Sequence, residues 1–186
     1  CSGDPDMETT RDAVLAAVEA GVDMVELGVP FSDPMADGPV IQEASQRALA
    51  AGSSLPATLE LIASLRAHTD IPVILFGYYN PFFRYGHERL AADLASAGGD
   101  GLLVVDLPPE EAAPTVKALR ASKLDRIFML APTSDQARIS AVAKVASGFV
   151  YFVAVTGVTG ERGAAPVGID TLVRTVRDKA GLPVGV

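Results

Sequence analysis

The feature that most constrains the fold of this 186-residue chain is a repeated alternation of two kinds of segment. Short apolar runs rich in Val, Ile, Leu and Phe alternate with Ala-rich stretches along the chain. Because the runs are continuous rather than alternating in polarity, they are typical of strands buried on both faces. The six predicted strands are residues 23–28, 71–76, 101–105, 126–130, 148–153 and 182–186. Strands that alternate with helices predict an α/β fold with a parallel sheet.

The stretches between the strands predict helices, because their apolar residues recur at helical spacing. This spacing is clearest at Leu15/Val18/Val22, Leu59/Ile62/Leu65 and Val116/Leu119. Pro, Ser or Asp mark three predicted helix starts, at Pro108-Pro109, Ser134-Asp135 and Asp170-Thr171. After the first strand the chain has room for a long loop and two helices, and an insertion of this kind is usually functional.

Two architectures fit this alternation, an open doubly wound sheet and a (β/α)8 TIM barrel. An open sheet normally has a Gly-rich first turn, but neither G-x-G-x-x-G nor G-x-x-x-x-G-K follows any predicted strand. The barrel is therefore favoured. A complete barrel has eight strands and takes about 250 residues. We expect residues 1–186 to form a single TIM-barrel domain that covers about strands 2 to 7 and is incomplete at both ends.

The composition argues against several classes of function. With 15 Lys and Arg against 23 Asp and Glu, the net charge of −8 gives no general attraction to nucleic acid or anionic membranes. One Cys and two His residues suggest neither a metal site nor a disulfide. No apolar run approaches the roughly 20 residues of a membrane-spanning helix. We expect a cytoplasmic protein that binds no metal, nucleic acid or membrane.

The strongest candidates for chemistry are Glu26 and Asp37, because the active site of a parallel barrel lies where the strands end. Glu26 lies in an otherwise apolar strand, where an unpaired carboxylate tends to take up a proton, as a general acid/base does. The alternative is a structural glutamate. Asp37 ends the loop that follows, where it could equally cap the next helix. Paired carboxylates suit lyase or hydrolase chemistry, and binding of a metal by the same oxygens is the rival explanation.

Three other strand ends carry polar or aromatic residues. Phe76 opens an aromatic cluster that could line a pocket for a flat ring, form a protein contact, or be an ordinary edge of the core. Asp106 could simply cap the next helix. The Gly-rich segment at residues 156–163 could be a mobile lid, an amide cradle for an anion, or a flexible turn.

One long motif carries a specific resemblance to a known family. Residues 25–42, VELGVPFSDPMADGPVIQ, resemble the signature of the tryptophan synthase alpha subunit family. The resemblance continues in order through the rest of the chain. It includes SGDP at residues 2–5, YYNP at 78–81, DLPPE at 106–110 and GVTG at 157–160.

The resemblance implies a (β/α)8 barrel that splits indole-3-glycerol phosphate into indole and glyceraldehyde 3-phosphate by retro-aldol cleavage, without a cofactor. Glu26 would be the general acid/base, which protonates indole C3 and handles the glycerol hydroxyl proton. Asp37 would hold the indole N–H and stabilise the positive charge that develops there. Tyr151 would flank the pocket, Thr159 would help close the lid, and Gly160 would lie beside the phosphate.

The resemblance also implies an alpha2-beta2 complex with a beta subunit that holds pyridoxal phosphate and receives the indole. Three loops would face that partner. Their residues would be Pro30, Asp33, Asn80, Pro81, Asp106 and Pro108. In the family, most of the first strand precedes Ser2, and a phosphate loop with two further barrel units follows the strand that contains Val186. The chain would therefore lack parts of the barrel.

Two kinds of rival hypothesis remain. A stand-alone indole-3-glycerol phosphate lyase would share Glu26, Asp37 and the barrel but work without a beta subunit. An inactive fragment or a non-catalytic barrel would keep the fold alone, since a fold does not fix a function. The presence of both carboxylates argues against a non-catalytic barrel.

Overall fold

Six parallel strands form one sheet in the computed structural model, which describes residues 1–153 and 169–186. The order β1-β2-β3-β4-β5-β6 follows the sequence, and each neighbouring pair is parallel. The strands are β1 (Val25–Gly28), β2 (Val73–Gly77), β3 (Gly101–Val104), β4 (Asp125–Leu130), β5 (Val150–Phe152) and β6 (Val184–Gly185). All six lie within the predicted runs or within one residue of them. This consecutive order is that of a barrel sheet, since a doubly wound sheet reverses its order at a switch point.

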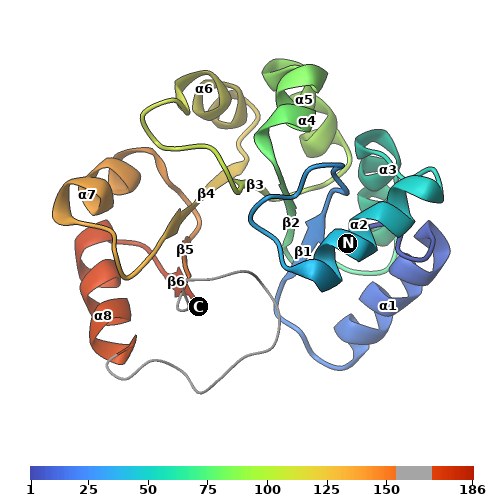
Figure 1. Cartoon of the computed structure of the whole chain (residues 1–186), viewed down its shortest axis with the longest axis horizontal. Coiled ribbons are helices and arrows are strands. Elements are labelled where there is room, and N and C mark those ends of the chain that lie inside the picture. Colours follow the sequence, from blue (N-terminus) through green and yellow to red (C-terminus); the bar gives the residue numbers. More distant parts are fainter. Residues whose placement is uncertain (154–168) are drawn as a thin grey trace.

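Helices form an arc around the outside of the curled sheet (Figure 1). In the described residues they are α1 (Met7–Glu19), α2 (Pro39–Ala50), α3 (Leu55–Leu65), α4 (Tyr79–Tyr85), α5 (His87–Ser96), α6 (Ala113–Ala121), α7 (Gln136–Val145) and α8 (Ile169–Ala180). The long insertion after β1 holds a loop and two helices, as predicted. No single helix in these ranges is long and apolar enough to cross a bilayer, and only α2 and α3 taken together, bent by 92°, have the required length and composition.

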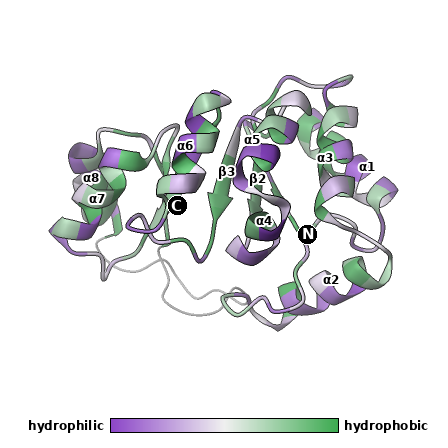
Figure 2. Ribbon diagram, turned by 90° about the horizontal axis from the view of Figure 1, so that it is seen from above, coloured by the Kyte–Doolittle hydropathy of each residue, from purple (hydrophilic) through white to green (hydrophobic). Residues whose placement is uncertain are grey.

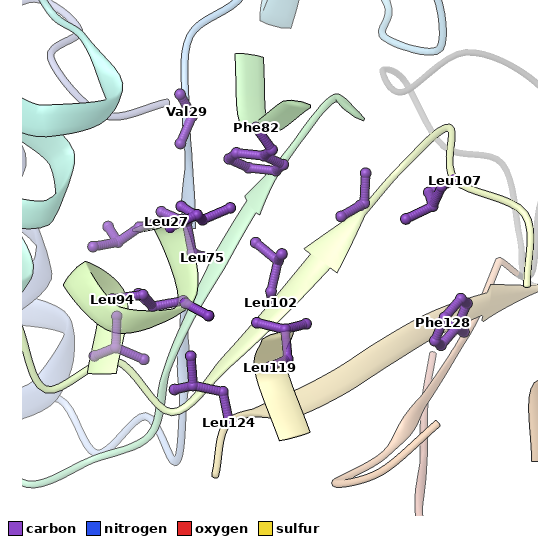
Figure 3. Packing of buried hydrophobic residues seen from close by; sticks show 14 of the residues in the cluster. Leu27, Val29, Leu75, Phe82, Leu94, Leu102, Leu107, Leu119, Leu124 and Phe128 are labelled. Atoms are coloured by element: carbon purple, nitrogen blue, oxygen red, sulfur yellow. The ribbon is translucent and has the colours of Figure 1, made fainter. Parts of the chain in front are cut away.

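Side-chain alternation along each strand separates two apolar clusters, one on each face of the sheet. The larger cluster lies between the sheet and the helices, and Figure 3 shows Leu27, Leu75 and Leu102 in it. The smaller cluster lies on the inner face and contains Ile74, Leu103 and Ile127. In Figure 2, β2 and β3 accordingly have the green colour of hydrophobic residues, while the helices carry hydrophilic residues as well. Both faces of the central strands are buried, which explains their continuous apolar sequence.

The helix starts follow the sequence prediction in part. Asp135 caps α7 as predicted, because its side chain accepts a hydrogen bond from the backbone N–H of Arg138 at 2.8 Å. The predicted start at Pro108-Pro109 is wrong, since α6 begins only at Ala113. Pro114 in its first turn lacks a backbone N–H and has a φ suited to that position.

Helix α4 was not predicted, because its sequence YNPFFRY contains Pro81 and lacks an Ala-rich stretch. Its buried residue is Phe82, which is 1% exposed. The ring of Phe82 packs over the end of β2, where Gly77 leaves room for it (Figure 3). A Cβ on Gly77 would lie 2.8 Å from Phe82 Cζ and 3.5 Å from Val29 Cβ. The position of α4 therefore depends on the absence of a side chain at Gly77.

We expect Gly77→Ala to lower the free energy of unfolding by about 1–3 kcal/mol, because overpacking forces a fully buried ring to move. Chemical denaturation of the parent and the variant measures the difference. Gly28→Ala is the matched control at the end of β1, since its added Cβ would meet no atom closer than 3.7 Å. Equal costs for the two variants would contradict this account of the packing.

Candidate active site

A cavity of about 200 Å³ lies at the carboxyl ends of β1 and β2. The lining residues are Cys1, Glu26, Gly28, Val29, Asp37, Ile41, Ser45, Phe76, Gly77 and Tyr78. The two carboxylates that the sequence singled out therefore line the same cavity, and Phe76 supplies part of its apolar wall. This is the end of a parallel barrel at which catalytic residues gather.

Glu26 reaches the cavity because of its place in β1. It pairs in register with Ile74, an inner-face residue, while the next residue, Leu27, packs beneath the helices. The Glu26 side chain keeps contact with solvent, but the protein around it removes enough water to raise the pKa of its carboxyl group. No ion pair to Glu26 forms among the described residues. A raised pKa makes the protonated form of a carboxyl group easier to reach, which suits a group that both gives and takes a proton.

Asp37 is half-buried at the end of the loop that follows β1, and neighbouring residues form hydrogen bonds with both its backbone and its side chain. Its backbone N–H donates to the Pro34 carbonyl at 3.1 Å, and its own carbonyl accepts from Gln42 Nε2 at 2.8 Å. Its carboxylate Oδ2 accepts a hydrogen bond from the Tyr78 hydroxyl at 2.9 Å. The alternative role as a helix cap is wrong, because Gly38 occupies the N-cap position of α2.

Tyr78 is the residue of this site that sequence reasoning missed. It is 5% exposed, and its ring packs against Phe31 with 5.4 Å between ring centroids. Burial and the neighbouring carboxylates, with Asp37 the closest, raise the pKa of Tyr78 to about 12, so its hydroxyl keeps its proton at neutral pH. The sequence showed only an aromatic cluster here. The available signal was a tyrosine directly after a strand in a predicted barrel.

Of the remaining predicted substrate-binding residues, the structure describes Tyr151 but not Thr159 and Gly160. Tyr151 lies in β5, in register with Met129, and packs against the inner-face cluster, as Phe76 does. Tyr151 is not among the residues that line the cavity. Thr159 and Gly160 lie outside the described residues.

The predicted partner-facing residues come from the loops and first helical turn after β1, β2 and β3. Asp33, Asn80 and Asp106 are exposed, whereas Pro30 is buried within the chain. Pro81 and Pro108 are half-buried. Asp106 does not cap the helix that follows it. Its Oδ1 instead accepts a hydrogen bond from the backbone N–H of Tyr79 at 2.6 Å, which caps α4 in the preceding unit.

Large exposed apolar side chains lie on the same segments. Met35 is 87% exposed in the loop after β1, Val40 is 66% exposed in the first turn of α2, and Phe83 is 58% exposed in α4. Large exposed apolar side chains are candidates for contact with another protein. The structure thus adds three apolar residues to the segments that the sequence had suggested for a partner.

Comparison with known proteins agrees with this arrangement. The family model described as "Tryptophan synthase alpha chain" matches residues 1–186. The chain belongs to the tryptophan synthase alpha chain family. A tryptophan synthase alpha chain from Citrifermentans bemidjiense is 56% identical over 185 residues, covering 100% of this chain and 69% of the relative. The corresponding chain of Geobacter sulfurreducens is 51% identical, with coverage of 100% and 70%.

Solved structures of the family share the fold. A structure of tryptophan synthase from Mycobacterium tuberculosis superposes with a TM-score of 0.91 at 40% identity, covering 100% of this chain and 70% of that chain. The alpha subunit from Legionella pneumophila gives 0.90 at 34% identity, with coverage of 100% and 70%. The α/β TIM-barrel prediction is confirmed, and the chain spans about 70% of the length of these relatives.

Membership of the family settles the class of the protein. Tryptophan synthase alpha chains are lyases of tryptophan biosynthesis, and they form a complex with a beta subunit. The alpha subunit carries no cofactor, since pyridoxal phosphate is held by the beta subunit. Within the described ranges, no group of three or more His, Cys, Asp and Glu residues could hold a metal ion.

Glu26 should make the folded chain less stable as pH rises. Because burial raises the pKa of Glu26 in the folded protein, the folded state binds more protons than the unfolded state between the two pKa values. Stability therefore falls as pH rises through that interval. We expect Glu26→Gln to be at least as stable as the parent at neutral pH, with the advantage lost below about pH 4, where Glu26 is protonated in both states.

Urea denaturation of the parent and Glu26→Gln at several pH values measures this effect. Glu43→Gln, on the exposed side of α2, controls for the removal of one negative charge. A Glu26→Gln protein that is markedly less stable than the parent at neutral pH would show that Glu26 has a structural role.

Proposed function

We propose that this chain cleaves indole-3-glycerol phosphate to indole and glyceraldehyde 3-phosphate, with Glu26 and Asp37 as its catalytic residues. The observation that carries the proposal is that both carboxylates line one cavity at the strand ends, and that their environments differ. Glu26 has no hydrogen-bond donor among the described residues and a raised pKa, which suits proton transfer. Asp37 accepts a hydrogen bond from Tyr78, which suits a carboxylate that must be held in one orientation toward a developing charge.

The reaction needs one group that moves protons and one that stabilises charge. Glu26 protonates indole C3, which becomes tetrahedral and leaves a positive charge that is shared with the ring nitrogen. Asp37 stabilises that charge at the ring N–H. The bond between C3 and the glycerol carbon then breaks, its electrons return to the ring, and Glu26 takes the hydroxyl proton as the aldehyde forms. Protons and electrons balance without a cofactor or an added water.

The other predicted site residues fit roles around this centre. Phe76 lines the cavity and would form an apolar wall for the indole ring. Tyr151 would flank the pocket from the inner face of the sheet, Thr159 would help close it over Asp37, and Gly160 would lie beside the substrate phosphate. We also propose that residues 1–186 belong to a single domain, because one cluster of buried side chains extends from Val14 in α1 to Val176 in α8.

Indole release from indole-3-glycerol phosphate tests the proposed reaction. We expect Glu26→Gln to lower the rate by about 10²–10⁴-fold, the range typical of a lost general acid/base. Glu43→Gln again serves as the control. The 186-residue chain and the product of the complete gene are assayed side by side, with and without a tryptophan synthase beta chain.

Each outcome separates the rival hypotheses. Indole from the parent but not from Glu26→Gln supports the lyase and the role of Glu26. Full activity without any response to the beta chain favours the stand-alone lyase. No indole from the complete gene product, or no loss in Glu26→Gln, would overturn the proposal in favour of a non-catalytic barrel.

We further propose an alpha2-beta2 assembly in the cytoplasm, in which Pro30, Asp33, Asn80, Pro81, Asp106 and Pro108 belong to the surface that faces the beta subunit. Support comes from a structural relative described as the tryptophan synthase a2b2 complex from Pyrococcus furiosus, with a TM-score of 0.89 and 36% identity. Its match covers 98% of this chain and 73% of that chain. The exposed apolar residues beside these loops support the same surface.

Phe83→Ala should weaken binding to a tryptophan synthase beta chain by about tenfold or more, as expected for a buried aromatic anchor at an interface. The variant should fold normally, because the side chain is 58% exposed in the free chain. Val22→Ala is the matched control, since Val22 is also an exposed apolar residue but lies before β1 at the opposite edge of the sheet. Titration calorimetry gives both affinities, and unchanged affinity in Phe83→Ala would exclude α4 from the interface.

A further inference from the structure

We propose that Tyr78 is a positioning residue that holds the carboxylate of Asp37 in the orientation needed for the reaction. The inference deepens the proposed function and rests on the role assigned there to Asp37. Its basis is the hydroxyl group of Tyr78, which lies between a backbone amide and the Asp37 carboxylate and contacts both.

Tyr78 itself is held rigidly. It is 5% exposed and follows β2 directly, as the N-cap residue of α4. Its ring packs against Phe31 from the loop after β1, with 5.4 Å between ring centroids. On one side Gly77 ends a strand buried in the sheet, and on the other side Phe82 fixes α4 over the strand end. The hydroxyl group is therefore presented from a rigid part of the fold.

The two contacts of the hydroxyl group determine where its proton points. The backbone N–H of Ala36 donates to the Tyr78 oxygen at 3.0 Å. A phenol has one proton of its own to donate, and here it goes to Asp37 Oδ2 at 2.9 Å. Because burial raises the pKa of Tyr78 to about 12, its hydroxyl remains a donor at neutral pH. Asp37 thus receives a hydrogen bond of fixed direction from a neutral group.

The backbone of Asp37 does not depend on this bond. Gln42 Nε2 donates to its carbonyl at 2.8 Å, and its N–H donates to the carbonyl of Pro34 at 3.1 Å. Ala36 is exposed, so its N–H can turn to water when the tyrosine hydroxyl is removed. Removing the hydroxyl should consequently take one directional hydrogen bond away from the Asp37 carboxylate and leave the backbone of Asp37 in place.

The consequence for the reaction follows from the proposed role of Asp37. A group that stabilises a charge formed only in the transition state must already be oriented, because reorienting it during the reaction adds to the barrier. Loss of the Tyr78 hydroxyl should therefore lower kcat more than it raises KM. If Tyr78 had only a structural role, loss of its hydroxyl would instead lower the amount of folded protein, without a larger effect on kcat than on KM.

The first measurement compares Tyr78→Phe with the parent in the indole-release assay, using the complete gene product with the beta chain. We expect kcat to fall by about 10–100-fold, with KM changed far less and with a similar melting temperature. Tyr85→Phe is the matched control, because Tyr85 also donates its hydroxyl to a carboxylate, Asp93 Oδ2, at 2.6 Å on the outer helices. Tyr85→Phe should keep the parental activity.

The second measurement is a double-mutant cycle with Asp37→Asn. If Tyr78 acts through Asp37, Tyr78→Phe should slow the parent strongly but slow Asp37→Asn by less than about threefold. Equal losses in both backgrounds, or parental kcat in Tyr78→Phe, would overturn the positioning role while leaving the proposed function intact. An Asp37→Asn protein with parental activity would overturn the proposed role of Asp37 itself, and the role of Tyr78 with it. Single-turnover rates are used so that slow variants can be measured.

Discussion

Parallel pairing of the strands in sequence order is the constraint on which the rest of the structure depends. It brings the carboxyl ends of all the described strands to one edge of the sheet and fixes which residues share a face. Glu26 is in register with Ile74, so both lie on the inner face, whereas a shift of one residue would place Glu26 beneath the helices. The apolar clusters on both faces of the sheet resist such a shift, because it would bury a carboxylate and expose Leu27.

Hydrogen bonds at the same edge join the loops of successive units. Tyr78 links the end of the β1 loop to the end of β2, and the adjacent residue, Tyr79, is linked by its backbone N–H to Asp106 after β3. The acceptor in both hydrogen bonds is a carboxylate, and hydrogen bonds to a charged group are about twice as strong as those between neutral groups. The next link, the ion pair between Arg138 and Glu110 at 2.7 Å, is largely exposed and contributes little. The bond from Tyr79 to Asp106 is exposed as well, whereas the bond from Tyr78 to Asp37 is partly buried. The firmest of these links is therefore the one at Asp37.

Most of the fold could be predicted from sequence because the strands are buried on both faces and read as continuous apolar runs. Helix α4 could not, because its stability comes from contacts that local propensity does not contain: Asp106 caps it from another unit, the ring of Tyr79 stacks on His87, and Phe82 fills the space over Gly77. Glu26 and Asp37 could be singled out because position at a strand end is a local property. The bond between Tyr78 and Asp37 joins residues 41 positions apart, and only the pairing of β1 with β2 brings them together.

The two carboxylates of the cavity lie in different environments, which matches the different roles proposed for them. Glu26 is on a strand, where partial desolvation favours the protonated form and no described side chain donates to it. Asp37 is on a loop, where a hydroxyl that keeps its proton at neutral pH always donates to it. A hydrogen-bond donor added beside Glu26 would stabilise its ionised form and also make it a weaker base. The environment that suits proton transfer at Glu26 therefore lowers the stability of the fold when Glu26 ionises. The lack of a hydrogen-bond donor to Glu26 among the described residues agrees with its proposed role.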